Sequence, residues 1–99
     1  MGDGQKRARF GVSHFKIELK ASARKSLGKL ENQDQLRVYA AIELLSNNPW
    51  PPLAVQIQGS PYFRVRVGDY RILYSIDSGR LIILIIDIGH RREIYRRVN

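Results

Sequence analysis

Apolar and charged residues alternate most clearly from Tyr62 to Val67, where Arg64 and Arg66 separate the aromatic and valine positions. A period of two is typical of a strand with one buried and one open face. Gly68-Asp69 follows immediately and fits a two-residue hairpin loop, because glycine at the first central position suits a type II′ turn. This loop sets the register of the hairpin and places Arg66 opposite Arg71 on one face of the sheet.

The remaining periodicities predict one α+β domain. Apolar positions three and four residues apart predict two helices, and the run Leu81–Ile86, which shows no alternation, predicts a central strand covered on both faces. The helices are expected to form an antiparallel hairpin packed on one side of a mostly antiparallel sheet. In the order β-α-α-β-β-β, the expected strands span 15–20, 62–67, 70–77 and 80–88, and the helices span 23–30 and about 34–46, with 50–61 as an irregular connection.

Several side chains receive structural roles from their positions. Asn32 or Asp34 is expected to cap the second helix at its N-terminus. Trp50, beside two prolines, is interpreted as a packed loop anchor rather than a platform for a nucleobase. The apolar stripe of the second helix is predicted at Val38, Ala41, Ile42 and Leu45, widened by Leu36 and Tyr39; Tyr70 and Tyr74 are predicted in the core, and Asp77 is expected to pair with Arg80 across a turn.

The amino-acid composition adds one further indication, a high net positive charge. Seventeen Lys plus Arg against nine Asp plus Glu give a net charge of +8 over 99 residues, which suits one domain and points to nucleic acid, an anionic membrane surface or an acidic protein as partner. There is no cysteine, and the two histidines are far apart, so neither a disulfide framework nor a metal site is expected. The sequence shows no membrane-spanning run and no secretory signal, so we expect a cytoplasmic protein. Residues 1–12 are predicted to be a flexible basic arm, and 13–99 a single domain.

The arginines of the hairpin carry the first indication of chemistry. Like charges in a cross-strand pair are destabilising, by a few tenths of a kcal/mol to about 1 kcal/mol. A fold tolerates the Arg66–Arg71 pair more easily if an anion lies between the two guanidinium groups, because their geometry matches phosphate oxygens. The alternative is a solvated basic face, which we favour for Arg64 taken alone; for the pair we favour an anion site.

Two segments carry a resemblance to a known family. Tyr62–Tyr74 ends in Gly-Asp-Tyr-Arg-Ile-Leu-Tyr, and Ile88–Tyr95 contains Gly-His-Arg-Arg-Glu-Ile-Tyr; Asn48-Pro49 follows the second helix. With the strand–helix–helix–meander order, this pattern resembles the RelE/ParE superfamily of bacterial toxins from type II toxin–antitoxin systems, and the RelE branch fits best. The resemblance covers about Phe15 to Arg97 and implies the RelE-like microbial RNase fold.

The resemblance also implies an activity and its partners. RelE-like proteins are ribosome-dependent endoribonucleases that cut mRNA in the A site, here expected to proceed by attack of the ribose 2′-hydroxyl without metal or other cofactor. An acidic cognate antitoxin is expected to neutralise the toxin, either by covering the arginine face or by displacing the C-terminal tail. Operator DNA is expected as a partner of the toxin–antitoxin complex alone, and no membrane is expected.

The family's site residues are assigned to this chain by their positions in the matching segments. The best-studied relatives carry lysines where this chain has Arg64 and Arg66, and arginine, with a pKa above about 12, is a poor general base. His90 is therefore either the missing acid or base or a structural histidine at a strand end. The resemblance places Arg64, Arg66, Arg71, Arg91 and Tyr95 in the site, and the chemistry of the residues adds His90. We expect catalysis by Arg66, Arg71, Arg91 and Tyr95, and RNA or phosphate binding by Arg64 and His90.

Two other functions remain open on the sequence. One is a ParE-like inhibitor of DNA gyrase that shares the fold and has no nuclease activity. The other is a basic nucleic-acid-binding module whose arginines bind phosphate without turnover. The convergent arginines favour the nuclease over both.

Overall fold

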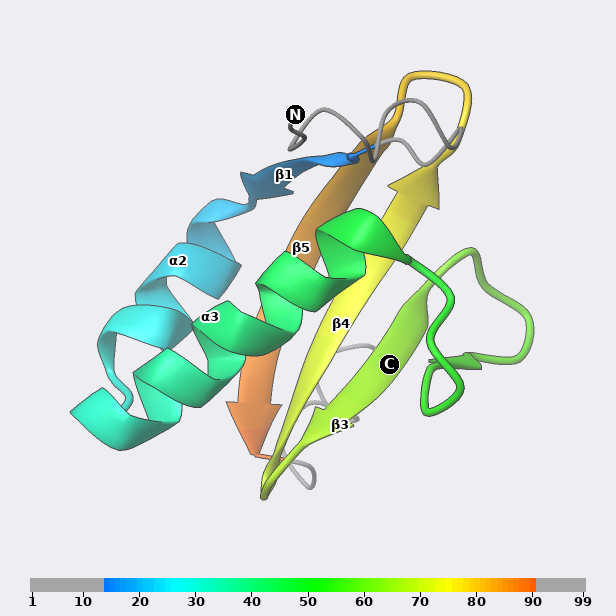
Figure 1. The fold of residues 1–99 in the computed structure, drawn as a ribbon. Helices are drawn as coiled ribbons and strands as arrows, with labels where there is room; N and C mark the ends of the chain where they lie inside the picture. The colour runs from blue at the N-terminus through cyan, green and yellow to red at the C-terminus, as the bar shows by residue number, and fades with distance from the viewer. Residues whose placement is uncertain (1–13, 91–99) are drawn as a thin grey trace.

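The computed structural model describes residues 14–90, in which two helices cover one face of a five-stranded sheet (Figure 1). Along the chain the elements are β1 (Lys16–Leu19), α2 (Ala21–Gly28), α3 (Asn32–Asn47), β2 (Val55–Gln56), β3 (Phe63–Val67), β4 (Tyr70–Asp77) and β5 (Ile82–His90). The strand order is β1-β5-β4-β3-β2, and β1 runs parallel to β5 while the other pairs are antiparallel. The predicted α+β fold is therefore confirmed; the predicted arm at 1–12 lies outside the described residues.

The β3–β4 hairpin has the register predicted from its turn. Arg66 pairs with Arg71, and Val65 pairs with Ile72. Gly68 has a φ of 59°, whereas Asp69 does not have a positive φ, as a type II′ turn requires. This register could be predicted from the local sequence, because the two turn residues fix which residues of β3 and β4 are paired.

Strand β5 lies between β1 and β4, as expected for an uninterrupted apolar run. The two faces of this strand are covered unequally. Its side chains under the helices are Ile83, Ile85 and Ile88, all buried, whereas Ile82, Leu84 and Ile86 are half-buried. Between Leu73 and Tyr74 the pairing of β4 with β5 shifts by one residue, which is a β-bulge.

Helix α3 differs from the prediction in two respects. Its N-cap is Glu31, which makes no side-chain capping bond, so the assignment of Asn32 or Asp34 as the cap is wrong. Leu36 is 68% exposed and Tyr39 is 54% exposed, so neither widens the core stripe. The stripe is centred on Val38, and Leu36 lies two residues earlier, about 200° around the helix, which directs it to solvent.

The connection between α3 and β3 contains a strand that periodicity could not predict. Val55–Gln56 forms β2, which pairs with Phe63 and Arg64 at the edge of the sheet. Two residues are too few for an alternation to be visible in the sequence. Trp50 contacts the ring of Phe15 edge to face, with a centroid distance of 6.1 Å, and keeps 51% of its surface exposed, as fits a loop anchor.

The β4–β5 turn follows the sequence prediction in its polar contacts. The backbone N–H of Arg80 donates to Asp77 Oδ1 at 3.0 Å, and the two side chains form an ion pair at 3.9 Å. Leu81 then adopts a φ of 57°, so β5 begins at Ile82 rather than at Arg80. Neither helix of residues 14–90 has the length and apolar character needed to cross a lipid bilayer.

Tyr74 is the aromatic centre of the core. It is fully buried, stacks on Phe63 with a centroid distance of 5.8 Å, and donates its hydroxyl to the Pro49 carbonyl at 2.8 Å. The prediction that Tyr74 is a core residue is confirmed. Tyr70, at the tip of the hairpin, is half-buried.

Burial raises the pKa of Tyr74 from 10.0 to about 12, which predicts a loss of stability in alkali. Below pH 10 the phenol is neutral in the folded and the unfolded chain. Between about pH 10 and 12 the unfolded chain ionises first, so the free energy of unfolding should fall by about 2–3 kcal/mol from this group. Urea unfolding at stepped pH measures the effect. Tyr74→Phe should lack this component of the decline, and an identical decline in the variant would contradict the assignment.

Candidate functional site

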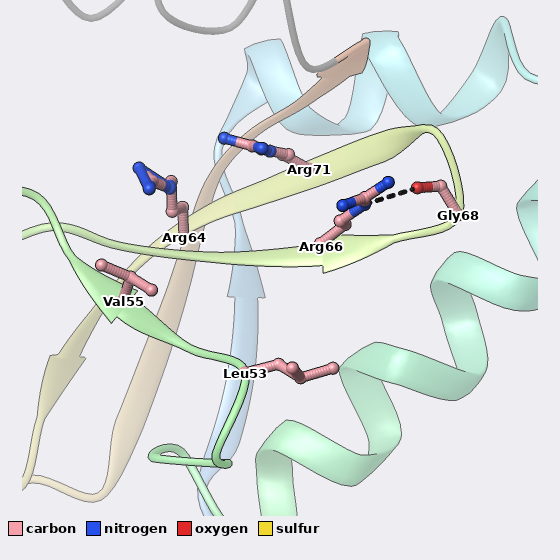
Figure 2. Close-up of a pocket in the computed structure, with 6 residues that line it drawn as sticks. All are labelled: Leu53, Val55, Arg64, Arg66, Gly68 and Arg71. Carbon is pink, nitrogen blue, oxygen red and sulfur yellow. Dashed lines mark hydrogen bonds between the residues drawn. The ribbon is translucent and has the colours of Figure 1, made fainter.

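Three arginines gather on the face of the sheet that the helices leave open. Val65 and Ile72 point to the helices and are buried in the core. Successive side chains of a strand point to opposite faces, so Arg64, Arg66 and Arg71 point to the other face. Figure 2 shows the three side chains on the same side of the hairpin. The structure thus brings together three of the predicted site residues.

These arginines line a hollow of about 460 Å³ that extends along the hairpin to its Gly68 turn (Figure 2). Among the described residues, the lining contains no carboxylate, so its charge is uniformly positive. Arg64 and Arg71 are half-buried, whereas Arg66 is exposed. The lining residues, which we call the arginine pocket, are Leu53, Val55, Arg64, Arg66, Gly68 and Arg71.

The turn of the hairpin holds one of these side chains. Arg66 Nε donates to the Gly68 carbonyl at 3.3 Å, a bond drawn in Figure 2. It uses one of the five N–H donors of the guanidinium group, so Arg66 is oriented while most of its donors can still serve a ligand. The register places Arg71 directly opposite. Two arginines on neighbouring positions of one face are suited to bind one tetrahedral anion from two sides.

His90 does not join the arginines. It lines a different hollow, of about 360 Å³, together with Ser26, Lys29 and Tyr70, on the helix side of the sheet. Its ring meets that of Tyr70 edge to face at 6.2 Å. Burial raises the pKa of Tyr70, and the Asp34 carboxylate, which accepts a hydrogen bond from the Tyr70 hydroxyl, raises it further. The predicted grouping of His90 with the arginine site is therefore not found.

The β-bulge explains the position of His90. From Asp77 to Tyr74 the β4–β5 pairing follows one register, in which His90 would fall on the same face as Arg71. The extra residue of the bulge shifts the pairing, so that Gly89 lies opposite Arg71 and His90 lies opposite Tyr70. Side chains alternate between faces, so one inserted residue moves the histidine to the helix side.

Two predicted catalytic residues, Arg91 and Tyr95, lie outside the described residues. Conversely, Leu53 and Val55 line the arginine pocket without having been predicted there. Both are exposed apolar side chains from the connection before β3, at 72% and 47%. The available signal was their position directly after two prolines, which marks a loop and gives no information about the partner strand.

The family described as "ParE toxin of type II toxin-antitoxin system, parDE" matches residues 17–95. A relative named Toxin RelG, from Mycobacterium tuberculosis, is 33% identical over 91 residues, which cover 84% of this chain and 98% of the relative.

Solved structures give the same picture of the fold. A RelBE toxin–antitoxin complex from Mycobacterium tuberculosis matches with a TM-score of 0.71 and 27% identity, covering 79% of this chain and 99% of the other. The isolated Escherichia coli RelE toxin matches with a TM-score of 0.69 and 18% identity, covering 87% of this chain and 95% of the other. At the lower identity the likeness supports the fold alone.

Proposed function

Since this chain belongs to the RelE/ParE superfamily of toxins from type II toxin–antitoxin systems, we propose that it is a ribosome-dependent endoribonuclease that cleaves mRNA. The Arg66–Arg71 pair carries the proposal. Two like charges face each other across a hairpin, in a pocket whose described lining has no acidic residue. Such a pair is unfavourable by itself and becomes favourable when a phosphate lies between its members.

The chemistry that this pocket suits is transfer of a phosphodiester. The ribose 2′-oxygen attacks the adjacent phosphorus, the bond to the 5′-oxygen of the next nucleotide breaks, and negative charge accumulates on the equatorial oxygens in between. Arg66 and Arg71 supply cations already in position for that charge, which is the largest contribution that a protein usually makes to such a step. Arg64, on the same face, is placed to hold a neighbouring phosphate. Arg91 and Tyr95 keep their proposed catalytic roles from the resemblance.

The proton transfers have no assigned residue within this pocket. Arginine stays protonated at physiological pH, so none of the three can remove the proton of the 2′-hydroxyl. His90 lines the hollow on the other side of the sheet, so we do not give it this role. We infer that the proton acceptor comes from the ribosome, from solvent or from residues 91–99, which is consistent with a toxin that cuts ribosome-bound message.

The alternative is a ParE-like inhibitor of DNA gyrase without nuclease activity. One observation favours it: the family that matches residues 17–95 is described by the ParE toxin. The two functions differ in what the arginine pocket must do, since a gyrase inhibitor needs no site for a reacting phosphate. In either case the partners proposed are an acidic cognate antitoxin, which would neutralise the toxin, and operator DNA bound by the toxin–antitoxin complex.

Primer extension on a reporter mRNA in a reconstituted translation reaction tests the proposal. We expect cuts spaced by codons that appear with ribosomes and are absent when the same message is incubated with the toxin alone. A gyrase supercoiling assay, run on the same preparation, should show no inhibition. Intact message together with loss of supercoiling would overturn the nuclease and support the ParE-like alternative.

A further inference from the structure

Two exposed apolar side chains line the arginine pocket beside its cations. Leu53 is 72% exposed and Val55 is 47% exposed, so neither belongs to the core. Both lie on the segment that precedes β3 and pairs with it at the edge of the sheet (Figure 2). A phosphate gains nothing from apolar neighbours, so two such side chains in one hollow indicate a ligand that has an apolar part as well as a negative charge.

The register of β2 places one of them next to a cation. Val55 pairs with Arg64 in the antiparallel ladder between β2 and β3. Residues directly opposite each other in such a ladder point to the same face, with their Cβ atoms about 4.5–5.5 Å apart. Since Arg64 lies on the open face of the sheet, Val55 lies on that face as well. The pocket therefore has an apolar surface immediately beside a guanidinium group.

A tight turn fixes the position of the other apolar side chain. The backbone N–H of Ala54 donates to the Pro51 carbonyl at 2.9 Å, which closes a β-turn with Pro52 and Leu53 at its two central positions. Proline at the first central position favours such a turn, because its ring fixes φ at about −65°. The backbone of Leu53 is thus held in place before any ligand binds, which lowers the entropic cost of a contact with its side chain.

We propose that Leu53 and Val55 form an apolar wall against which the base of one message nucleotide lies, next to the phosphate bound by the arginines. A nucleotide joins the apolar face of a base to an anionic phosphate through one sugar. The arginine pocket offers the matching pair of surfaces within one hollow. The inference rests on the proposed function and adds to it the residues that hold a base of the substrate.

The wall contacts the face of the base and leaves its edge unread. Leucine and valine have no hydrogen-bonding groups in their side chains, so they do not distinguish the donors and acceptors of the different bases. Both side chains are exposed, so the polar edge of a base lying on them can remain in water. The gain in affinity comes from the apolar area covered. The wall therefore supports binding of any base at this position.

The test uses a message that cannot be cleaved. Stalled ribosomes carry a message whose A-site nucleotides are 2′-deoxy, so the attacking oxygen is missing, and each base in turn is replaced by an abasic residue. The Kd of the wild-type toxin should rise about fivefold or more at one of these positions, because the wall loses its contact. Leu53→Asn should raise the Kd for the intact message by about three- to fivefold. It should bind that abasic message like the wild type, because the contact is already absent.

Leu36→Asn is the matched control. Leu36 is 68% exposed on α3 and does not line the arginine pocket, so its variant should bind both messages within about twofold of the wild type. Val55→Thr keeps the shape of the side chain and the β-branching that suits a strand, and replaces one methyl group by a hydroxyl. It should show the pattern of Leu53→Asn with a smaller loss.

The outcomes separate this inference from the nuclease proposal. Equal losses of Leu53→Asn on the intact and abasic messages, or no loss, would overturn the wall even if the all-ribose message is cut. A loss of affinity for the antitoxin alone would assign the wall to that protein and would also overturn it. A base-dependent loss without any cutting of the all-ribose message would support the wall and contradict the nuclease. A wild-type toxin that does not bind the stalled ribosomes would overturn both.

Discussion

Arg66→Ala and Arg71→Ala are each expected to lower the rate of message cleavage by about 10²–10³-fold, the usual loss when one preorganised donor to a transition-state charge is removed. The two residues are paired across the hairpin on the open face of the sheet and would share one phosphate, so removal of either leaves that charge held from one side. Because the two act as a unit, the double variant should lose less than the product of the single losses.

The same substitutions should leave stability unchanged or slightly improved. Replacing one member of the pair relieves a cross-strand repulsion of a few tenths of a kcal/mol to about 1 kcal/mol. If a variant loses activity but keeps its stability, the removed arginine serves function rather than the fold. Single-turnover cleavage on stalled ribosomes and urea unfolding of each variant provide the two measurements.

Arg80→Ala is the matched control for charge. Arg80 lies at the other hairpin, is exposed, and forms an ion pair with Asp77 at 3.9 Å, and its removal changes the net charge by the same amount. Its hydrogen bond to Asp77 is made by the backbone N–H and survives the substitution. If Arg80→Ala slowed cleavage as much as Arg71→Ala, the effect would reflect general attraction to RNA, and the assignment of the pair as the phosphate site would fail.

Tyr74→Ala is expected to lower the free energy of unfolding by about 3–5 kcal/mol, the largest effect on stability predicted for a single residue of this chain. Its ring is fully buried and stacks on Phe63, and its hydroxyl donates to the Pro49 carbonyl at 2.8 Å. The substitution leaves a cavity in the core and an unsatisfied carbonyl at the start of the connection. Small domains are stable by only about 5–15 kcal/mol, so the variant should be close to unfolding at 37 °C.

Two further variants separate the contributions of the hydroxyl and of burial to this loss of stability. Tyr74→Phe keeps the ring and removes the hydroxyl, so it should cost about 1–3 kcal/mol, the penalty for a buried carbonyl without its donor. Tyr39→Ala removes a tyrosine that is 54% exposed on α3 and should cost less than about 1 kcal/mol. Urea unfolding midpoints measure all three. A Tyr39→Ala loss as large as that of Tyr74→Ala would contradict the description of the core.

Local patterns in the sequence determined the β3–β4 hairpin and its arginine pair. A period of two and a glycine in the turn act over neighbouring residues, so they fix which side chains share a face without reference to the rest of the chain. The apolar run of β5 and the helical stripe at Val38, Ile42 and Leu45 are of the same kind. The family pattern in Tyr62–Tyr74 and Ile88–Tyr95 was likewise readable from the sequence.

The tertiary structure alone decided what depends on contacts between distant segments. Leu53 and Val55 reach the arginine pocket because a two-residue strand pairs with β3, and nothing in the residues before β3 encodes that partner. His90 lies outside the predicted site because a one-residue bulge in the β4–β5 pairing places it on the other face of the sheet. Pairing between strands depends on the whole sheet, whereas alternation within a strand depends on its own residues. The sequence therefore determined the arginine pair, and the tertiary structure determined the walls of its pocket.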